Sequence, residues 1–355
     1  MTPEGAPSDA PVAPVVPAAP GPVKRWVLGA RPRTLPAAVV PVLVGTAAAH
    51  PWSHHVRSVS VGHGAGRLTV LVAPPEGLRV NSWWCALGAL VVALAIQIGT
   101  NYANDYSDGI RGTDDVRVGP VRLVAAGLAT PTAVKRAALV SFGLAAVVGL
   151  GLAWATSWWI LVVGGACLLA GWFYTGGPRP YGYAGLGELF VFVFFGLVAT
   201  VGTFYVQTLQ LGVTVVWFAA AAVGLVATAL LLANNLRDIG TDTVSGKRTV
   251  AVRLGRRGGG WLYVACVGLP FVGVLVWGLL SVTGAIGSAR PVIAFLPLLA
   301  LPLVAGPVRL VRSDAEGRAL LPVLAATGRL QLAFGVVLSI ALWLWIPLWL
   351  PVASR

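Results

Sequence analysis

Long apolar stretches alternate with short polar ones along most of this sequence. Nine stretches are long enough to cross a membrane as helices, because about 20 apolar residues span the hydrocarbon core of a bilayer. Glycine, alanine and serine recur at close spacing in several of them, which favours tight packing between helices. The pattern predicts an all-α integral membrane protein, a nine-helix bundle. The predicted helices cover residues 26–49, 83–104, 133–154, 158–174, 187–208, 212–236, 261–282, 291–311 and 331–352.

Composition agrees with the apolar pattern. Of 355 residues, 57% are hydrophobic and only 10% are charged, which excludes a soluble domain with a large core. Residues 1–22 differ from the rest because they are rich in Pro and Ala and lack the basic-then-apolar order of a signal peptide. We therefore expect a disordered cytoplasmic tail over residues 1–22 and one membrane domain over residues 23–355.

The positive charge is unevenly divided between the two sides of the predicted bundle. The N-terminal segment and the second, fourth, sixth and eighth connections hold twenty of the 25 lysines and arginines, and the other side holds five. Cytoplasmic loops of membrane proteins carry this excess, so the N-terminus is predicted to be cytoplasmic and the C-terminus to lie outside. The net charge of +13 then reflects topology and anionic lipid headgroups rather than nucleic acid.

Neither the cysteines nor the histidines form a metal-binding pattern. The three cysteines, Cys85, Cys167 and Cys266, lie far apart and form no CxxC pair, so neither a disulfide framework nor a zinc site is predicted. The four histidines, His50, His54, His55 and His63, lie in the external connection at residues 50–82. We interpret that connection as a solvated loop containing glycine.

The sequence "NYANDYSDGIRGTD" places several polar side chains at the end of the second predicted helix. Asn101, Asp105 and Asp108 share one helical face, Asn104 lies beside that face, and Asp114 follows a turn containing glycine. A solvated helix end normally scatters its charges. Carboxylates gathered on one face at a membrane boundary indicate a functional site, because their desolvation requires a compensating cation.

The sixth predicted helix ends in a similar way, with "LLANNLRDIGTDTVSGKRT". Asp238 and Asp242 lie one helical turn apart, Asn234 lies one turn before Asp238, and Lys247 and Arg248 follow. Two apolar helices therefore end on the same side in clusters of Asn and Asp. The repetition predicts one site shared by both clusters.

Facing carboxylates beside cations indicate a magnesium-bound diphosphate. Mg²⁺ is usually held by a few carboxylates together with substrate phosphates, and Lys247, Arg248 and Arg122 would supply positive charge to the diphosphate. The sequence has no Walker lysine motif and no GxGxxG after a strand, so a lipid diphosphate fits better than a nucleotide. A cation transporter is the alternative, but the acids lie on one side rather than at midplane and no repeated pair of broken helices is evident.

The two motifs together resemble the paired Asp-rich motifs of the UbiA superfamily of intramembrane prenyltransferases. Four further stretches narrow the resemblance to the 1,4-dihydroxy-2-naphthoate polyprenyltransferases of menaquinone synthesis, and it covers roughly residues 24–350. These stretches are "RPRTLPAAVVPVLVG", "GPVRLVAAGLAT", "YTGGPRPYGYAGLGELFVFVFFG" and "VGTFYVQ". The resemblance implies a nine-helix fold in a bacterial cytoplasmic membrane with the active site facing the cytoplasm. It also implies transfer of a polyprenyl chain from its diphosphate to 1,4-dihydroxy-2-naphthoate, with loss of CO2 and diphosphate, to give demethylmenaquinone.

The resemblance also implies roles for individual residues. Asp105, Asp108, Asp238 and Asp242 would hold Mg²⁺, with two ions expected, and Asn104 and Asp114 would assist. Lys247 stands out because the chain has only three lysines against 22 arginines, and it would act as a point charge on the diphosphate with Asn104, Arg122 and Arg248. The first motif departs from the common DxxxD spacing, since Gly112 stands four residues after Asp108. That departure leaves open whether Asp114, Asp115 or neither completes the metal shell.

The residues that would bind the aromatic acceptor are less clearly indicated by the sequence. Arg31, Arg33 and Arg179 are candidates to bind its carboxylate, and tyrosines near the cytoplasmic end are candidates for cation–π contact with the prenyl cation. Interfacial tyrosines are equally common in membrane proteins. Other acceptors remain open, namely 4-hydroxybenzoate, homogentisate and the haem or chlorophyll macrocycle. The tyrosines are Tyr174, Tyr181, Tyr183 and Tyr205.

Overall fold

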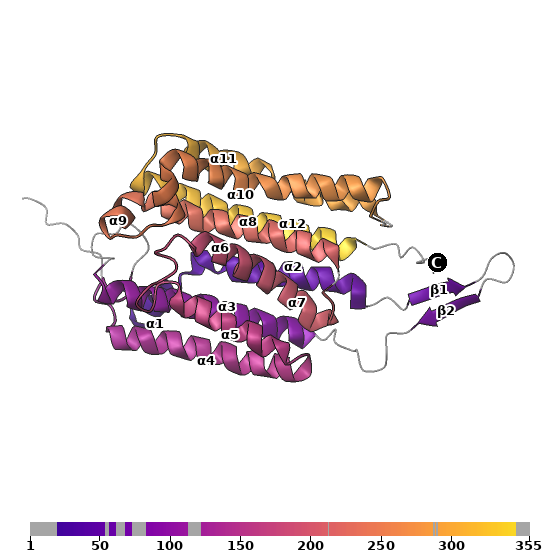
Figure 1. Ribbon diagram of the computed structural model, residues 1–355, viewed down its shortest axis with the longest axis horizontal. Coiled ribbons are helices and arrows are strands. Elements are labelled where there is room, and N and C mark those ends of the chain that lie inside the picture. Colours follow the sequence, from indigo (N-terminus) through magenta and orange to yellow (C-terminus); the bar gives the residue numbers. More distant parts are fainter. Residues whose placement is uncertain are drawn as a thin grey trace, which may run out of the picture.

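Helices lying side by side along one long axis make up most of the protein (Figure 1). The computed structural model describes residues 20–53, 57–61, 68–72, 83–112, 122–211, 213–286, 288 and 290–345. Residues 1–19 of the predicted tail, and Asp114 and Asp115, lie outside these ranges. In chain order the elements are α1 (Pro22–Ala30), η1 (Pro32–Thr34), α2 (Pro36–Ser53), β1 (Arg57–Val61), β2 (Leu68–Val72), α3 (Trp83–Ile110), α4 (Pro131–Ala155), α5 (Trp159–Phe173), α6 (Gly187–Val191), η3 (Phe192–Val198), α7 (Ala199–Thr208), α8 (Thr214–Arg237), α9 (Ile239–Val244), α10 (Val250–Val282), η4 (Pro291–Ala300), α11 (Pro302–Arg312), η5 (Gly317–Leu320) and α12 (Leu321–Leu344).

The described helices make this a multi-pass membrane protein. Six of them are long and apolar enough to cross a bilayer, and the number rises to eight if each of two bent pairs forms one span. The remaining predicted span corresponds to α5, an apolar helix of 15 residues that falls short of the usual spanning length. The total of nine spans stays a prediction.

Several helices differ from their predicted bounds where charged residues meet the membrane edge. α10 begins at Val250 rather than at residue 261, and Gly255, with a non-helical backbone (φ 66°, ψ 178°), puts a kink between its first turn and the long apolar part. α12 begins at Leu321 rather than at residue 331. The first predicted helix is a pair, Pro22–Thr34 and Pro36–His50, bent by 55°, and within the first member Arg31 separates α1 from η1 with a left-handed backbone, φ 53°. Apolar runs mark the hydrocarbon-spanning part of a helix, not its full length.

A short β-hairpin, absent from the predictions, occupies part of the external connection. β1 and β2 pair antiparallel, with Arg57 opposite Val72 and Val61 opposite Leu68. Both strands are rich in β-branched residues, which favour extended backbone. The hairpin lies at the opposite end of the molecule from α9 (Figure 1). His54, His55 and His63 lie outside the described residues.

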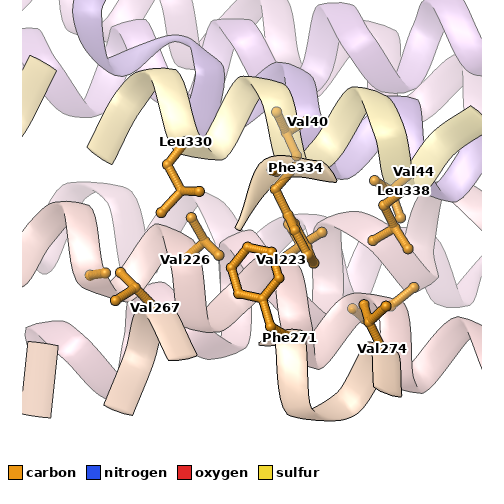
Figure 2. Close-up of a cluster of buried hydrophobic side chains, with 14 of the residues drawn as sticks. Val40, Val44, Val223, Val226, Val267, Phe271, Val274, Leu330, Phe334 and Leu338 are labelled. Atoms are coloured by element: carbon orange, nitrogen blue, oxygen red, sulfur yellow. The ribbon is translucent and has the colours of Figure 1, made fainter. Parts of the chain in front are cut away.

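The main core lies among α2, α8, α10 and α12. Phe271 of α10 and Phe334 of α12 meet edge to face, with ring centroids 5.3 Å apart. Since lipid is as apolar as these side chains, close packing rather than exclusion from water holds such helices together. Figure 2 shows the interdigitated side chains Val40, Val44, Val223, Val226, Val267, Phe271, Val274, Leu330, Phe334 and Leu338.

A close backbone approach joins η3 to α8. η3 is a π-helical segment that continues α6 into α7. At its closest point Gly196 faces Gly224, and a Cβ added to Gly196 would lie 2.9 Å from both the carbonyl oxygen of Ala220 and the backbone nitrogen of Gly224. Only glycine leaves room for this approach.

Gly196→Ala is expected to lower the stability of the bundle by about 1–3 kcal/mol, because the added methyl group forces the two backbones apart. The matched control is Gly202→Ala, where a Cβ meets no atom within 4 Å. Thermal unfolding of the purified proteins in one detergent measures both. An unchanged melting temperature for Gly196→Ala would contradict the close packing of η3 on α8.

Candidate functional site

The polar face predicted at the end of α3 is buried. Asp105 is 1% exposed and Asp108 is 2% exposed, and Asn101 and Asn104 are buried with them. A solvated helix end would leave these side chains in water. Their burial means that other parts of the chain cover them and must supply donors and positive charge.

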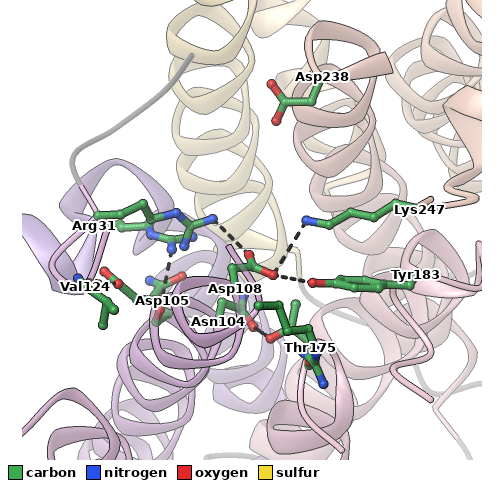
Figure 3. A network of polar contacts seen from close by, with 12 residues as sticks. Arg31, Asn104, Asp105, Asp108, Val124, Thr175, Tyr183, Asp238 and Lys247 are labelled. Atoms are coloured by element: carbon green, nitrogen blue, oxygen red, sulfur yellow. Dashed lines mark hydrogen bonds and ion pairs between the residues drawn. The ribbon is translucent and has the colours of Figure 1, made fainter. Parts of the chain in front are cut away.

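Asp108 receives donors from three separate segments. Its Oδ2 lies 3.4 Å from an Arg122 guanidinium nitrogen, and its Oδ1 lies 3.6 Å from Nζ of Lys247. The Tyr183 hydroxyl donates a hydrogen bond of 2.5 Å to Oδ1. Figure 3 shows Lys247 and Tyr183 reaching Asp108 from one side, across from the helix that carries it.

The contact between Lys247 and Asp108 joins the two sequence motifs. Asp108 ends the first polar face on α3, whereas Lys247 follows α9 in the second motif. The backbone N–H of Lys247 donates to the carbonyl of Asp242 at 2.8 Å, and the next N–H, of Arg248, donates to the carbonyl of Tyr183 at 2.8 Å. Nζ of Lys247 also lies 4.6 Å from the centroid of the Tyr183 ring. The shared site predicted from the two motifs therefore has a direct physical link.

Asp105 anchors the segment that follows the first motif. Its Oδ2 accepts the backbone N–H of Leu123 at 2.7 Å, and its Oδ1 accepts that of Val124 at 3.1 Å. These bonds hold the neighbouring Arg122 next to Asp108. Asn104 is fixed differently, because its Oδ1 accepts a hydrogen bond of 2.7 Å from the Thr175 hydroxyl.

The second cluster lies where α8 ends and α9 begins. Asp238 forms a bidentate pair with its neighbour Arg237, with both N–O distances 2.6 Å. Both side chains are buried, and Asp242 is buried one turn further on. The backbone N–H of Asp242 donates to the carbonyl of Asp238 at 2.8 Å, which continues the helical turn between the two carboxylates.

A third polar group fixes the bend between α1 and α2. Asn101 donates to the carbonyl of Ala30 at 2.9 Å and to the Thr34 hydroxyl at 3.0 Å. Arg31 lies between α1 and η1 and donates to the carbonyl of Asn101 at 3.5 Å, and Figure 3 shows its side chain on the side of Asp105. The left-handed backbone of Arg31 therefore places a cation beside the first cluster.

The other predicted binding residues are less buried than the aspartates. Arg33, Arg179 and Arg248 are exposed. Tyr174 is half-buried, and its ring meets that of Tyr181 edge to face at 5.5 Å. Burial raises the pKa of Tyr181, whose hydroxyl donates to the carbonyl of Ala170 at 2.8 Å. Tyr181 is thereby a neutral structural donor.

Tyr205 does not lie near the aspartates, so that prediction is wrong. The helix formed by α6, η3 and α7 carries Tyr205 near its far end, and roughly 27 Å of helix separates Tyr205 from Gly187. Figure 1 shows α7 at the end of the bundle away from α9. The direction of this helix, which runs away from the loop that contains Tyr183, is the physical reason.

The chemistry of the buried donors suits Mg²⁺, although the described residues contain no group of three His, Cys, Asp or Glu side chains close enough to hold a metal. Asp105, Asp108, Asp238 and Asp242 are all buried, and carboxylate oxygens are the ligands that Mg²⁺ takes together with phosphates and water. Asp108 and Asp238 are now paired with Arg122, Lys247 and Arg237. An anionic ligand would attract these cations and leave the carboxylates available to metal.

Several contacts of the site were missed in the sequence. Thr175 and Arg237 carried no assigned role, although Arg237 directly precedes Asp238. The sequence predicts only cation–π contact for Tyr183, which also donates to Asp108. Glu188, the only acid within the predicted helix over 187–208, has no predicted role either. Its position alone was a usable signal, because an acid inside an apolar run requires a reason.

Comparisons with known proteins show the family of the chain. A model of the UbiA prenyltransferase family matches residues 68–320. The chain is 46% identical to the 1,4-dihydroxy-2-naphthoate octaprenyltransferase of Mycobacterium tuberculosis (strain ATCC 25618 / H37Rv), over 90% of this chain and 96% of that protein. It is 35% identical to the protein of the same name from Escherichia coli (strain K12), over 85% of this chain and 89% of that protein.

Solved structures share the fold at low sequence identity. A UbiA homologue from Archaeoglobus fulgidus bound to DMAPP and Mg²⁺ superposes with a TM-score of 0.57 at 13% identity, covering 90% of this chain and 98% of the homologue. A UbiA homologue from Aeropyrum pernix K1 in its apo form gives a TM-score of 0.55 at 14% identity, covering 87% of this chain and 95% of that one.

Proposed function

Because this chain belongs to the UbiA prenyltransferase family, we propose that it transfers a polyprenyl chain from polyprenyl diphosphate to 1,4-dihydroxy-2-naphthoate. The reaction releases CO2 and diphosphate and gives demethylmenaquinone. The resemblance predicted from the motifs is confirmed by the family match, and relatives named for this acceptor align over most of the chain. The single structural observation that supports the proposal is the meeting of the two motifs at Asp108 and Lys247.

Asp105, Asp108, Asp238 and Asp242 would hold Mg²⁺, with Asn104 as an assisting ligand. Two ions suit two carboxylate clusters that approach from different helices, and the predicted role of Asp114 belongs to the same proposal. The bound metal would neutralise the diphosphate as it leaves. Asp105 would keep its backbone bonds to Leu123 and Val124 in addition, since each carboxylate oxygen accepts more than one donor.

Lys247 and Arg122 would also bind the diphosphate once the substrate is present. Both now compensate the charge of Asp108, and both are buried, so each would gain from a diphosphate placed between the clusters. Positive charge fixed in advance stabilises the leaving group as the allylic C–O bond breaks. Arg248 is exposed at the edge of the same segment and would serve the outer part of the diphosphate.

The apolar bundle and its aromatic residues would protect the prenyl cation until it meets the acceptor. Water is excluded by the helices around the site, and the Tyr174 ring lies next to Gly187 at the start of α6. Arg31 is the best placed of the predicted partners for the acceptor carboxylate, because it lies beside the first cluster (Figure 3). Arg33 and Arg179 are exposed and would act only at the entrance.

The orientation in the membrane follows from charge. The basic connections lie at the end of the bundle that carries the aspartates, and this excess is typical of the cytoplasmic side. We therefore place the active site at the cytoplasmic face of a bacterial cytoplasmic membrane. The prenyl chain would then lie among the helices and the surrounding membrane lipid.

Asp108→Asn and Asp238→Asn are each expected to reduce prenyl transfer at least about 100-fold, since each removes a charge that would bind metal in the transition state. The assay measures diphosphate release and prenylated product in purified membranes with and without Mg²⁺. Chelation of Mg²⁺ should abolish transfer by the wild type. The exposed residue Asp314 provides the control Asp314→Asn, which should stay active. Full transfer without divalent metal would contradict the proposal.

The acceptor is tested by competition between aromatic acids. Membranes given one labelled polyprenyl diphosphate and equal amounts of 1,4-dihydroxy-2-naphthoate, 4-hydroxybenzoate and homogentisate should yield a prenylated naphthoquinol with loss of CO2, identified by its mass. A product formed from 4-hydroxybenzoate or homogentisate alone would show that the acceptor assignment is wrong while the transferase chemistry holds.

A further inference from the structure

Glu188 is a buried carboxylate that the proposed mechanism does not use. Eight charged side chains are buried in the described part of the chain. The eighth, Glu188, lies on α6 and is 6% exposed. The other seven belong to the two aspartate clusters or to the cations beside them, and they are Asp105, Asp108, Arg122, Arg237, Asp238, Asp242 and Lys247.

Only one oxygen of Glu188 receives a hydrogen bond from another residue. Oε1 accepts a hydrogen bond of 2.8 Å from the Asn235 side chain of α8. Oε2 is buried without a hydrogen-bond partner among the described residues, and the ion pairs of those residues do not include Glu188. A buried carboxylate oxygen without a donor is costly. The arrangement therefore indicates a donor that no other described residue supplies.

Glu188 lies on the interior side of the second aspartate cluster. Its partner Asn235 precedes Asp238 by three residues, which is about 4.5 Å along α8 toward the interior. Its backbone carbonyl accepts the Thr228 hydroxyl at 3.4 Å, and Thr228 lies about 15 Å from Asp238 along the same helix. Glu188 also follows Tyr183, which donates to Asp108, by only five residues.

This depth matches the place that an aromatic acceptor must occupy. A diphosphate held between the aspartate clusters puts the first carbon of its prenyl chain on the interior side, and the acceptor ring has to approach that carbon. Because the acceptor's own carboxylate would be repelled by Glu188, the group facing Oε2 must be a donor. A ring hydroxyl is a suitable donor, and a hydrogen bond from a hydroxyl to a carboxylate is among the stronger ones.

On the basis of the proposed function, we propose that Glu188 binds a ring hydroxyl of the aromatic acceptor through Oε2, while Asn235 holds the Glu188 carboxylate in place through Oε1. The bond orients the ring for attack on the prenyl carbon and increases the electron density of the ring. It also makes Glu188 a specificity residue, since a site built to accept a hydroxyl rejects an analogue that lacks one.

The first test is Glu188→Gln, which keeps the side-chain shape and an oxygen for Asn235 but turns the second acceptor into a donor. We expect the KM for 1,4-dihydroxy-2-naphthoate to rise at least about tenfold, with the KM for polyprenyl diphosphate unchanged within about twofold. The exposed residue Glu316 provides the control Glu316→Gln, which should change neither constant. Equal changes in both constants, or none, would overturn the assignment.

A second measurement uses the inhibition constants of acceptor analogues instead of the KM for the acceptor. 1-Hydroxy-2-naphthoate and 4-hydroxy-2-naphthoate each lack one ring hydroxyl, and both are tested as competitive inhibitors of the wild type and of Glu188→Gln. The analogue that lacks the hydroxyl bound by Glu188 should inhibit both proteins equally, whereas the other should bind the wild type at least about tenfold more tightly. Equal inhibition of the two proteins by both analogues would overturn the assignment.

The two proposals fail in different ways. If the wild type prenylates no aromatic acid, the proposed function itself is wrong. If the wild type transfers normally and Glu188→Gln keeps the wild-type KM for the acceptor, only the assignment of Glu188 is wrong. Should Glu188→Gln fail to fold in detergent, the wild type still decides, because it must discriminate at least about tenfold between the two hydroxynaphthoates.

Discussion

The desolvation of Asp108 is the constraint on which the site depends. A carboxylate with 2% exposure at the end of a membrane helix requires positive charge and hydrogen-bond donors close by. Three segments far apart in the sequence supply them through Arg122, Tyr183 and Lys247. One buried charge thereby ties α3, the loop before α6 and the segment after α9 into a single site.

The rest of the bundle positions these segments. α3 and α8 end on the same side, so their terminal aspartates lie at one end of the molecule (Figure 1). Asp105 uses backbone bonds to hold the segment that carries Arg122, and Asn101 fixes the bend that presents Arg31. The apolar core among α2, α8, α10 and α12 keeps the helix ends in place without contributing polar groups to the site.

Much of this architecture could be predicted from the sequence because the membrane leaves few alternatives. Apolar length identified the helices, and charge asymmetry placed both aspartate motifs at one end. The hairpin, the early start of α10 and the left-handed backbone at Arg31 were not predictable in this way. They depend on local backbone geometry and on polar residues outside the hydrocarbon, where hydropathy carries no information.

The sequence predicts which residues belong to the site, but not which residues each of them contacts. Spacing predicted Asp108 and Asp238, and the scarcity of lysine singled out Lys247, but neither could reveal that Tyr183 donates to Asp108 or that Arg237 turns back onto its neighbour Asp238. Such contacts depend on how the loop before α6 folds over α3. Glu188 was missed for the same reason, because its bond to Asn235 links two helices whose register the sequence does not specify.

The central claim is that the two motifs act as one diphosphate site through Asp108 and Lys247. A double-mutant cycle tests it, with the affinity for a non-cleavable polyprenyl diphosphate analogue measured in saturating Mg²⁺ for the wild type, Asp108→Asn, Lys247→Met and the double variant. Residues in direct contact are expected to couple, so the double variant should lose at least about tenfold less affinity than the product of the two single losses. Single losses that simply multiply would show two independent clusters and would contradict a shared site.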